Sequence, residues 1–177
     1  MLVRALRGLV AATALLAAVS STSAAQAPTN ESRFAVTGGV DMPMGDFADL
    51  ANMGFVIGGQ FTMPLGEVLK FRLNADYAMN GFHDDLVNFL GDGNFTRLGV
   101  MANVIYPIGG EMGLYGLGGL GFNSVNTDLD GSEAEGDVAW NLGVGLGKGR
   151  WFVEARYQSI MSDPNLTSLP IVFGLRF

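Results

Sequence analysis

Cysteine is absent from this chain of 177 residues. An exported domain of this size without disulfides must obtain its stability from its fold or from a membrane. Basic residues are also scarce, with 10 Lys+Arg against 17 Asp+Glu and a formal net charge of −7. Because nucleic-acid binding requires a basic patch, this balance argues against a nucleic-acid partner.

The N-terminal segment has the organisation of a secretory signal peptide. Arg4 and Arg7 give a positive start, residues 9–19 form a short apolar run, and small residues lead up to Ala25. The apolar run is shorter than the roughly 20 residues of a transmembrane helix. We predict a signal peptide over residues 1–25, with a retained amphipathic anchor as the alternative. The remaining residues, 26–177, carry 8 Lys+Arg against 17 Asp+Glu, a net charge of −9, and form one domain.

No later segment is long and apolar enough for a transmembrane helix, although 49% of the residues are hydrophobic and 26 are glycine. A membrane β-barrel has this composition, because its strands alternate and each gives only a weak signal. In the stretch from Leu69 to Asn80, apolar residues alternate with polar residues at period two. Strands of this kind are predicted over residues 33–42, 54–65, 69–80, 94–107, 112–123, 136–147, 150–159 and 169–177.

One predicted strand breaks this alternation. In residues 112–123, Tyr115 and Leu117 are in phase with the apolar face, whereas Leu120 and Phe122 are one step out. A β-bulge at the glycine pair 118–119 would restore a single apolar face.

The predicted connections alternate in length. Those at residues 64–68, 108–111 and 147–150 are tight, and those at 43–53, 81–93, 124–135 and 160–168 are long and polar. Short turns on one rim and long loops on the other are typical of outer-membrane barrels. The sequence therefore predicts an all-β fold, an eight-stranded antiparallel up-and-down transmembrane β-barrel with short periplasmic turns and long extracellular loops.

A soluble lipocalin-like barrel is the rival architecture, because alternation alone does not say which face is outside. Three features favour the membrane: an inner face rich in Gly, Asn, Thr and Arg, aromatic residues near the strand ends, and Phe177 as the last residue. The aromatic residues predict two interfacial girdles, one of Phe34, Tyr106, Tyr115, Trp151 and Phe177, and one of Phe55, Tyr77, Phe122, Trp140 and Tyr157.

The strand that ends on Phe177 and the segment Pro43-Met44-Gly45-Asp46-Phe47 resemble the small eight-stranded outer-membrane barrels of the outer-membrane protein A and X type. This resemblance implies a location in the bacterial outer membrane, contact with outer-membrane lipids, and recognition of Phe177 by the assembly machinery. A monomer is expected. No peptidoglycan-binding domain is expected after the barrel.

Seven charged residues fall on the predicted inner face: Lys70, Arg72, Asp76, Arg97, Glu154, Arg156 and Arg176. Unpaired charge in a narrow lumen is costly, so these side chains should pair. We predict an ion pair between Asp76 and Arg97, with Glu154 as the alternative partner of Arg97. A plug of salt bridges is favoured over a polar lining for ion passage, since eight strands leave little room.

Two further features could carry chemistry. His83, the only histidine, lies beside Asp84 and Asp85 but near no serine, so a solvated loop histidine is favoured over a catalytic one. The acidic loop from Asn126 to Asp137 has oxygen ligands at calcium-loop spacing, but it ends in Asp rather than Glu and lies between strands. Calcium binding there is left open, and no catalytic, cofactor-binding or metal-ligating residue is assigned.

The sequence therefore predicts a non-enzymatic outer-membrane barrel with a structural or surface-interaction role and no cofactor. A narrow pore or small-solute transporter is the alternative. A lipid-modifying barrel enzyme is the third and less favoured hypothesis.

Overall fold

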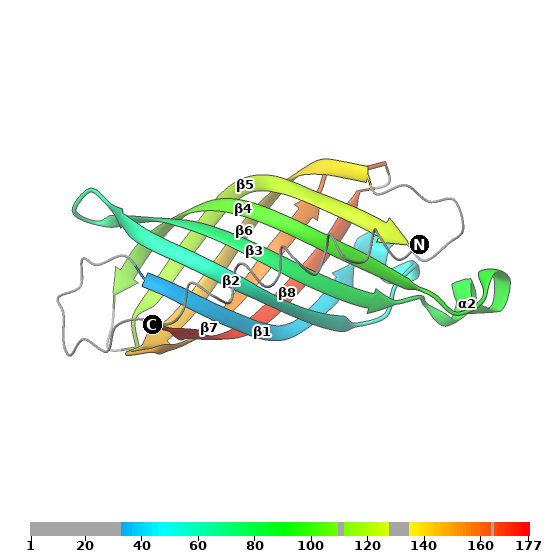
Figure 1. Cartoon of the computed structure of the whole chain (residues 1–177), viewed down its shortest axis with the longest axis horizontal. Coiled ribbons are helices and arrows are strands. Elements are labelled where there is room, and N and C mark those ends of the chain that lie inside the picture. The colour runs from blue at the N-terminus through cyan, green and yellow to red at the C-terminus, as the bar shows by residue number, and fades with distance from the viewer. Residues whose placement is uncertain (1–32, 110–111, 128–134, 164) are drawn as a thin grey trace, which may run out of the picture.

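A computed structural model describes residues 33–109, 112–127, 135–163 and 165–177 of the chain. In these residues the chain forms eight antiparallel strands around a single lumen (Figure 1). The strands are β1 (Arg33–Met44), β2 (Gly54–Leu65), β3 (Leu69–Gly81), β4 (Asn94–Gly109), β5 (Leu114–Thr127), β6 (Glu135–Lys148), β7 (Trp151–Ile160) and β8 (Leu166–Arg176).

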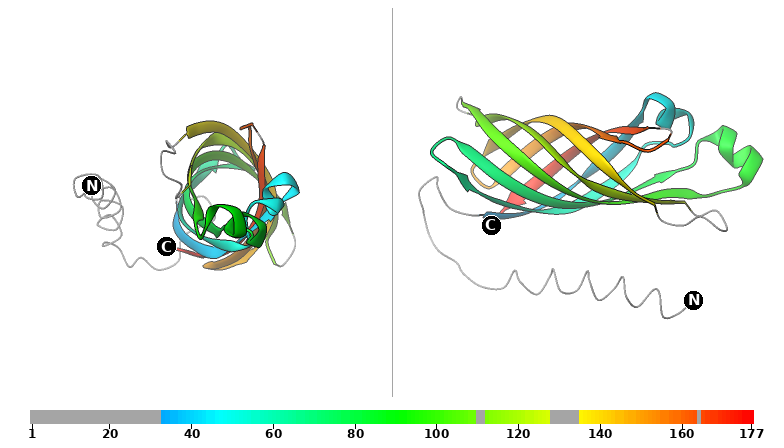
Figure 2. Two further views of the ribbon diagram at one scale, coloured as in Figure 1. Left: turned by 90° about the vertical axis from the view of Figure 1, so that its right-hand side faces the viewer. Right: turned by 90° about the horizontal axis from the view of Figure 1, so that it is seen from above.

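Each strand pairs with its sequence neighbour, and β8 returns to pair with β1, which closes the barrel. The closing ladder runs from Ala35 opposite Arg176 to Met44 opposite Thr167. The backbone N–H of Phe177 extends it by donating to the carbonyl of Phe34 at 2.8 Å. Seen end-on, the strands form a complete ring (Figure 2). The predicted up-and-down topology is therefore confirmed.

The two faces of the strands differ as the alternation predicts. Apolar side chains such as Ile57, Leu73 and Val144 are exposed on the outside, whereas Thr37, Asn74 and Arg156 are buried in the lumen. An apolar exterior around a polar interior is the reverse of a soluble barrel and suits a lipid environment. None of the helices in the described part of the chain is long and apolar enough to cross a bilayer.

Strand β5 differs from the prediction. Its pairing with β4 and β6 continues without interruption through Gly118 and Gly119, so the predicted bulge is wrong. Tyr115 and Leu117 consequently point into the lumen, and Leu120 and Phe122 point outward. The tyrosine fits inside because Gly145 lies opposite it: a Cβ on Gly145 would come within 2.1 Å of the Tyr115 ring.

The connections define two rims. The short-turn rim carries the β2–β3, β4–β5 and β6–β7 turns together with Arg33 and Phe177 (Figure 1). The long-loop rim carries a 3₁₀ helix, η2 (Gly45–Asp49), and a short helix, α2 (Asp84–Leu90), the latter on a projecting β3–β4 extension. The β7–β8 connection is shorter than predicted, because the two strands remain paired up to Ile160 and Leu166.

Candidate functional site

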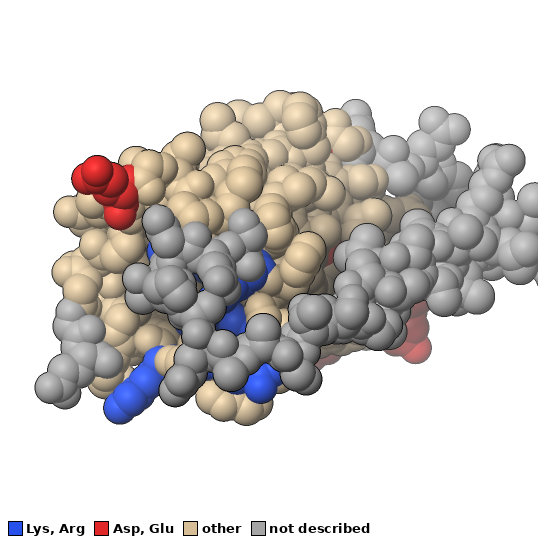
Figure 3. Space-filling model, turned by 60° about the vertical axis from the view of Figure 1, so that its left-hand side comes forward, with Lys and Arg blue, Asp and Glu red and all other residues tan. Residues whose placement is uncertain are grey.

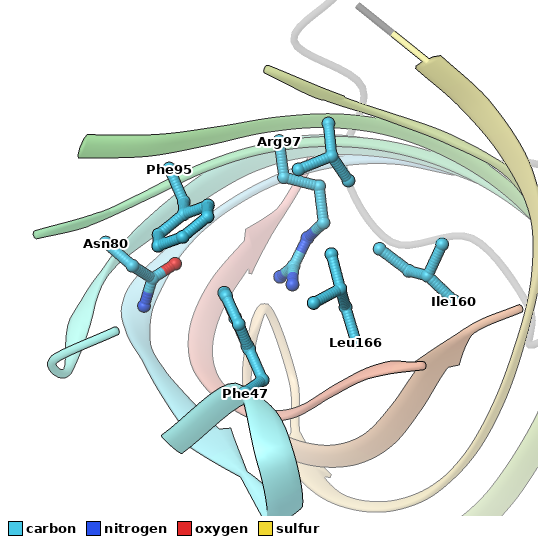
Figure 4. A pocket seen from close by; sticks show the side chains of 7 residues that line it. Phe47, Asn80, Phe95, Arg97, Ile160 and Leu166 are labelled. Carbon is cyan, nitrogen blue, oxygen red and sulfur yellow. The ribbon is translucent and has the colours of Figure 1, made fainter. Parts of the chain in front are cut away.

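The lumen is the candidate site, since it holds most of the buried polar and charged side chains. At the long-loop rim it is closed by Phe47 of η2, which is 3% exposed. The ring of Phe47 packs edge-on against Phe95 at 5.4 Å, and Phe95 also contacts Phe82 at 4.9 Å. Only a cavity of about 10 Å³ remains beneath these rings, and Arg97 and Leu166 help to line it (Figure 4).

An ion pair lies directly below this aromatic lid. Arg97 of β4 extends across the lumen, and its Nη2 lies 2.9 Å from Oδ1 of Asp41 on β1. Its Nη1 donates to the hydroxyl of Ser168 on β8 at 3.0 Å. Asp41 is fully buried and Arg97 nearly so. These contacts connect three strands across the lumen and close it to solvent below the lid.

The predicted pair of Asp76 and Arg97 is wrong, and the register gives the reason. Asp76 lies opposite Gly99 rather than Arg97, and it faces Arg156 of β7 instead, with 3.0 Å between Oδ2 and Nη1. In an eight-stranded barrel the lumen is narrow enough for an arginine to reach the far wall. Partners are therefore found across the lumen as readily as along the sheet.

Glu154, the alternative partner of Arg97, belongs to a second cluster in mid-barrel. It accepts hydrogen bonds from Arg72 at 2.5 Å and from the Tyr115 hydroxyl at 2.8 Å, both through Oε2. Its Oε1 lies 3.5 Å from Nε of Arg156. The two clusters together define the lumenal plug, which consists of Asp41, Arg72, Asp76, Arg97, Glu154 and Arg156. Three arginines balance three carboxylates, which agrees with the predicted plug of salt bridges. The prediction was wrong for Lys70 and Arg176, which were also expected to pair but have no ion pair with a carboxylate among the described residues.

Below the plug the lumen widens into a cavity of about 330 Å³ at the short-turn rim. We call this cavity the basic vestibule. It is lined by Arg33, Ala35, Gln60, Thr62, Lys70, Arg72, Ile105, Pro107, Gly109, Gly113, Leu114, Tyr115, Gly147 and Arg176. Lys and Arg side chains gather at this end of the molecule (Figure 3). The lining described here contains four basic residues and no carboxylate.

Two lumenal aromatic residues were not recognised as such from the sequence. Tyr115 was assigned to the outer girdle, and Phe152, now 2% exposed, lies inside against Gly174 of β8. The signal that could have placed these rings inside is a glycine directly opposite each of them. Gly145 lies opposite Tyr115 and Gly174 lies opposite Phe152, and each glycine leaves room for a ring in the narrow lumen. The sequence also gave no indication that Gln60 lines a cavity.

On the outer surface, the remaining girdle residues lie as predicted, in two groups near the rims. At the short-turn rim, Phe34, Tyr106, Trp151 and Phe177 are exposed, and Trp151 stacks on Phe173 at 4.9 Å. Toward the long-loop rim, Phe55 contacts Tyr77 and Trp140 contacts Tyr157. Such paired belts are typical of the two interfaces of a bilayer.

His83 lies within the described residues, whereas most of the acidic loop does not. His83 directly precedes α2, is partly exposed, and has its Nδ1 3.8 Å from Oδ2 of Asp85. Among the described residues, the side chain of His83 is paired with this carboxylate and not with a serine. Most of the acidic loop between Asn126 and Asp137 lies outside the described residues, so its calcium-like spacing stays untested. Elsewhere in the described chain, no group of three or more His, Asp or Glu side chains could hold a metal ion.

Comparisons with known proteins agree with this architecture. The model of the outer membrane protein beta-barrel domain family matches residues 11–177. The chain is similar to Ail, the attachment invasion locus protein of Yersinia pestis, with a TM-score of 0.58 and 17% identity over 82% of this chain and 97% of that chain. The structure of Ail in complex with the heparin analogue sucrose octasulfate gives a TM-score of 0.55 and 16% identity, over 83% of this chain and 99% of that chain.

The N-terminal β-barrel domain of Pseudomonas aeruginosa OprF gives a TM-score of 0.47 and 16% identity, over 84% of this chain and 98% of that chain. No match was found among curated proteins. At these identities the two Ail structures support the fold alone. The family model covers most of the chain. The chain therefore belongs to the outer membrane protein beta-barrel domain family and is an eight-stranded barrel of the bacterial outer membrane, with short periplasmic turns and long extracellular loops.

Proposed function

We propose that this barrel is a non-enzymatic anchor that presents its extracellular loops to a partner outside the cell. The observation that carries the proposal is the closure of the extracellular half of the lumen by Phe47 and by the Arg97–Asp41 pair. A sealed lumen offers nothing to an external solute, so interaction from outside falls to the loops. Loops on a rigid scaffold are common carriers of binding function.

The β3–β4 extension is the best candidate for the contact region. It projects beyond the rim and ends in α2, where Phe89 is 88% exposed (Figure 1). Asp84, Asp85 and Asp92 surround this aromatic residue in the sequence. An exposed aromatic residue among carboxylates suits a partner with a basic, partly apolar surface. The similar protein Ail is described by its attachment role and binds a heparin analogue, a polyanion, which these carboxylates would repel.

The proposal includes three expectations about partners. The exposed apolar belt contacts outer-membrane lipids, the protein acts as a monomer, and the assembly machinery recognises Phe177 at the end of β8. A catalytic role for His83 is not proposed, because its side chain lies in a loop rather than against the lipid-facing wall. Mass spectrometry of lipids from expressing cells tests this exclusion, and a new lipid product would contradict it.

The loop proposal is tested with cells that express the protein. Residues 84–90 are replaced by a Gly/Ser linker, and attachment to surfaces coated with a basic protein is measured beside cells that express the unaltered chain. We expect attachment to be lost while the heat-modifiable mobility of the folded barrel remains. A matched control replaces the periplasmic turn 66–68. Undiminished attachment without α2 would contradict the proposal.

A narrow pore is the second candidate, and the basic vestibule favours it, because this cavity already hollows the periplasmic end of the lumen. Conduction would still require the Arg72–Glu154 and Arg97–Asp41 pairs to separate. Planar-bilayer recordings distinguish the two candidates. The anchor predicts no regular conductance steps, whereas a steady open-channel current would favour the pore.

A further inference from the structure

The basic vestibule has two chemically different walls. Its polar residues come from four consecutive strands of the ring: Arg176 from β8, Arg33 from β1, Gln60 and Thr62 from β2, and Lys70 and Arg72 from β3. Its larger apolar and aromatic residues come from strands β4 and β5: Ile105, Pro107, Leu114 and Tyr115. A ligand that fills the cavity therefore meets hydrogen-bond donors on one side and hydrocarbon on the other.

Most of the positive charge of this cavity is uncompensated. Arg72 is neutralised by Glu154, but Arg33, Lys70 and Arg176 have no ion pair with any carboxylate among the described residues. Instead, Lys70 experiences the positive charges of Arg33, Arg72 and Arg176. A concave site lined by one sign of charge concentrates ions of the opposite sign. The lumenal plug, which is balanced, contrasts with the vestibule, which is not.

Gln60 adds an uncharged donor to the lining. Its side chain is 4% exposed, and its amide Nε2 has no hydrogen-bond partner among the described residues. Buried donors are usually satisfied, so this amide can take an acceptor that enters the lumen. Other lumenal polar atoms are in the same state, among them both amide atoms of Asn141, so the choice of the vestibule rests on its charge.

The wall is also held in position before any ligand arrives. The Arg176 guanidinium lies 4.6 Å from the centre of the Phe152 ring and donates to the carbonyl of Gly149 at 3.4 Å. Arg72 donates to the hydroxyl of Thr62 at 3.3 Å as well as to Glu154. Donors that are already fixed lose little conformational entropy on binding, so most of the free energy of their contacts contributes to the binding affinity.

We propose that the basic vestibule binds the phosphate group of a small organic phosphate that enters from the periplasm. A phosphate offers several acceptor oxygens to guanidinium, ammonium and amide donors at once, with charge-assisted hydrogen bonds. The organic part of the ligand lies against Leu114 and the facing wall. A cavity of about 330 Å³ has the size of small-molecule sites. This site is separate from the extracellular loops, so it does not depend on the surface-interaction role.

The test uses the full barrel, ¹⁵N-labelled and folded in phosphatidylcholine nanodiscs, titrated at constant ionic strength with inorganic phosphate and with phenyl phosphate. We expect saturable shifts of the Gln60 side-chain amide signals, with phenyl phosphate binding more tightly than inorganic phosphate. Lys70→Gln and Arg33→Gln should each weaken phenyl phosphate by about tenfold, which corresponds to 1.4 kcal/mol. Both variants remove a charge that is repelled by its neighbours, so both should fold.

Lys148→Gln is the matched control, because it removes the same charge from an exposed position on the same rim, outside the lining. Binding should be unchanged in this variant. A repeat in phosphatidylglycerol nanodiscs distinguishes the sources of phosphate: weakened binding assigns the site to a lipid headgroup, and unchanged binding assigns it to a soluble phosphate. Absence of saturable shifts, or an equal loss in Lys148→Gln and Lys70→Gln, would overturn the proposal.

Discussion

Arg97 of β4 and Asp41 of β1 form a buried ion pair with 2.9 Å between Nη2 and Oδ1, although their strands are not neighbours in the barrel. The pair links opposite walls near the extracellular mouth, just below Phe47. Such a contact has no equivalent in an open sheet, where side chains meet only along and between adjacent strands. The interior of this barrel therefore consists largely of ion pairs between side chains from different strands.

Asp41→Ala should therefore destabilise the barrel strongly. The substitution leaves Arg97 buried without its carboxylate, which costs about 3–5 kcal/mol in a dry site and less where water enters. The double variant Asp41→Ala/Arg97→Ala should recover part of the loss, because the orphaned charge is then gone. Denaturant titrations in lipid vesicles measure the coupling. The same cycle on Asp76 and Arg97 is the control and should give a smaller coupling; equal couplings would contradict the cross-lumen pairing.

Gly174 is expected to be intolerant of a side chain. A Cβ at this position would lie 2.0 Å from Cζ of Phe152, whose ring occupies the space directly opposite. Gly174→Ala should lower the free energy of unfolding by about 1–3 kcal/mol, the usual cost of overpacking. Gly38→Ala is the control, since a Cβ there meets nothing within 4 Å. Adding Phe152→Leu to Gly174→Ala should restore stability in part, and similar losses for both glycines would argue against the lumenal ring.

These relationships show what the sequence could and could not predict. The faces of seven strands follow from alternation, because period two is a local property that each strand carries by itself. The partner of Arg97 is not local: it depends on the register of several ladders and on the width of the closed ring. Tyr115 was misplaced for a related reason. An aromatic residue near a strand end suits a lipid interface, and only the glycine opposite it on β6 indicates a place inside.

The vestibule shows the same limit for the candidate site. Lys70, Arg72 and Arg176 were assigned to the inner face from alternation, and they do lie in the lumen. Alternation does not give the depth of a residue along the barrel axis, so it could not separate the paired arginines from the unpaired ones. The orphaned amide of Gln60 is visible only once its neighbours are in place.

A charged residue on the outer surface should lower the free energy of unfolding, and the loss should increase with the depth of the residue in the bilayer. Val144 is exposed on the apolar face of β6, between Trp140 and the periplasmic end of the strand at Lys148. Val144→Arg should therefore cost about 2–4 kcal/mol near the bilayer midplane. Val138→Arg, on the same face but beyond Trp140, should cost about 0–1 kcal/mol. Refolding titrations in lipid vesicles compare the two, and a reversed order would contradict the placement of the apolar belt.

Replacement of Phe177 should impair assembly without altering any extracellular loop. The ring of Phe177 is half exposed on the apolar face after β8, with the Arg150 guanidinium 5.7 Å from its centre. Because this ring lies half exposed on the outer surface, Phe177→Lys should reduce the amount of folded barrel in the outer membrane far more than it reduces the stability of barrel refolded in vitro. Heat-modifiability gels of membrane fractions and denaturant titrations of purified protein provide the two measurements. Phe34→Lys is the matched control, since Phe34 is another exposed aromatic residue on the same rim. Its effect on assembly should follow its effect on stability, whereas normal membrane levels of Phe177→Lys would show that the terminal ring is not a recognition signal.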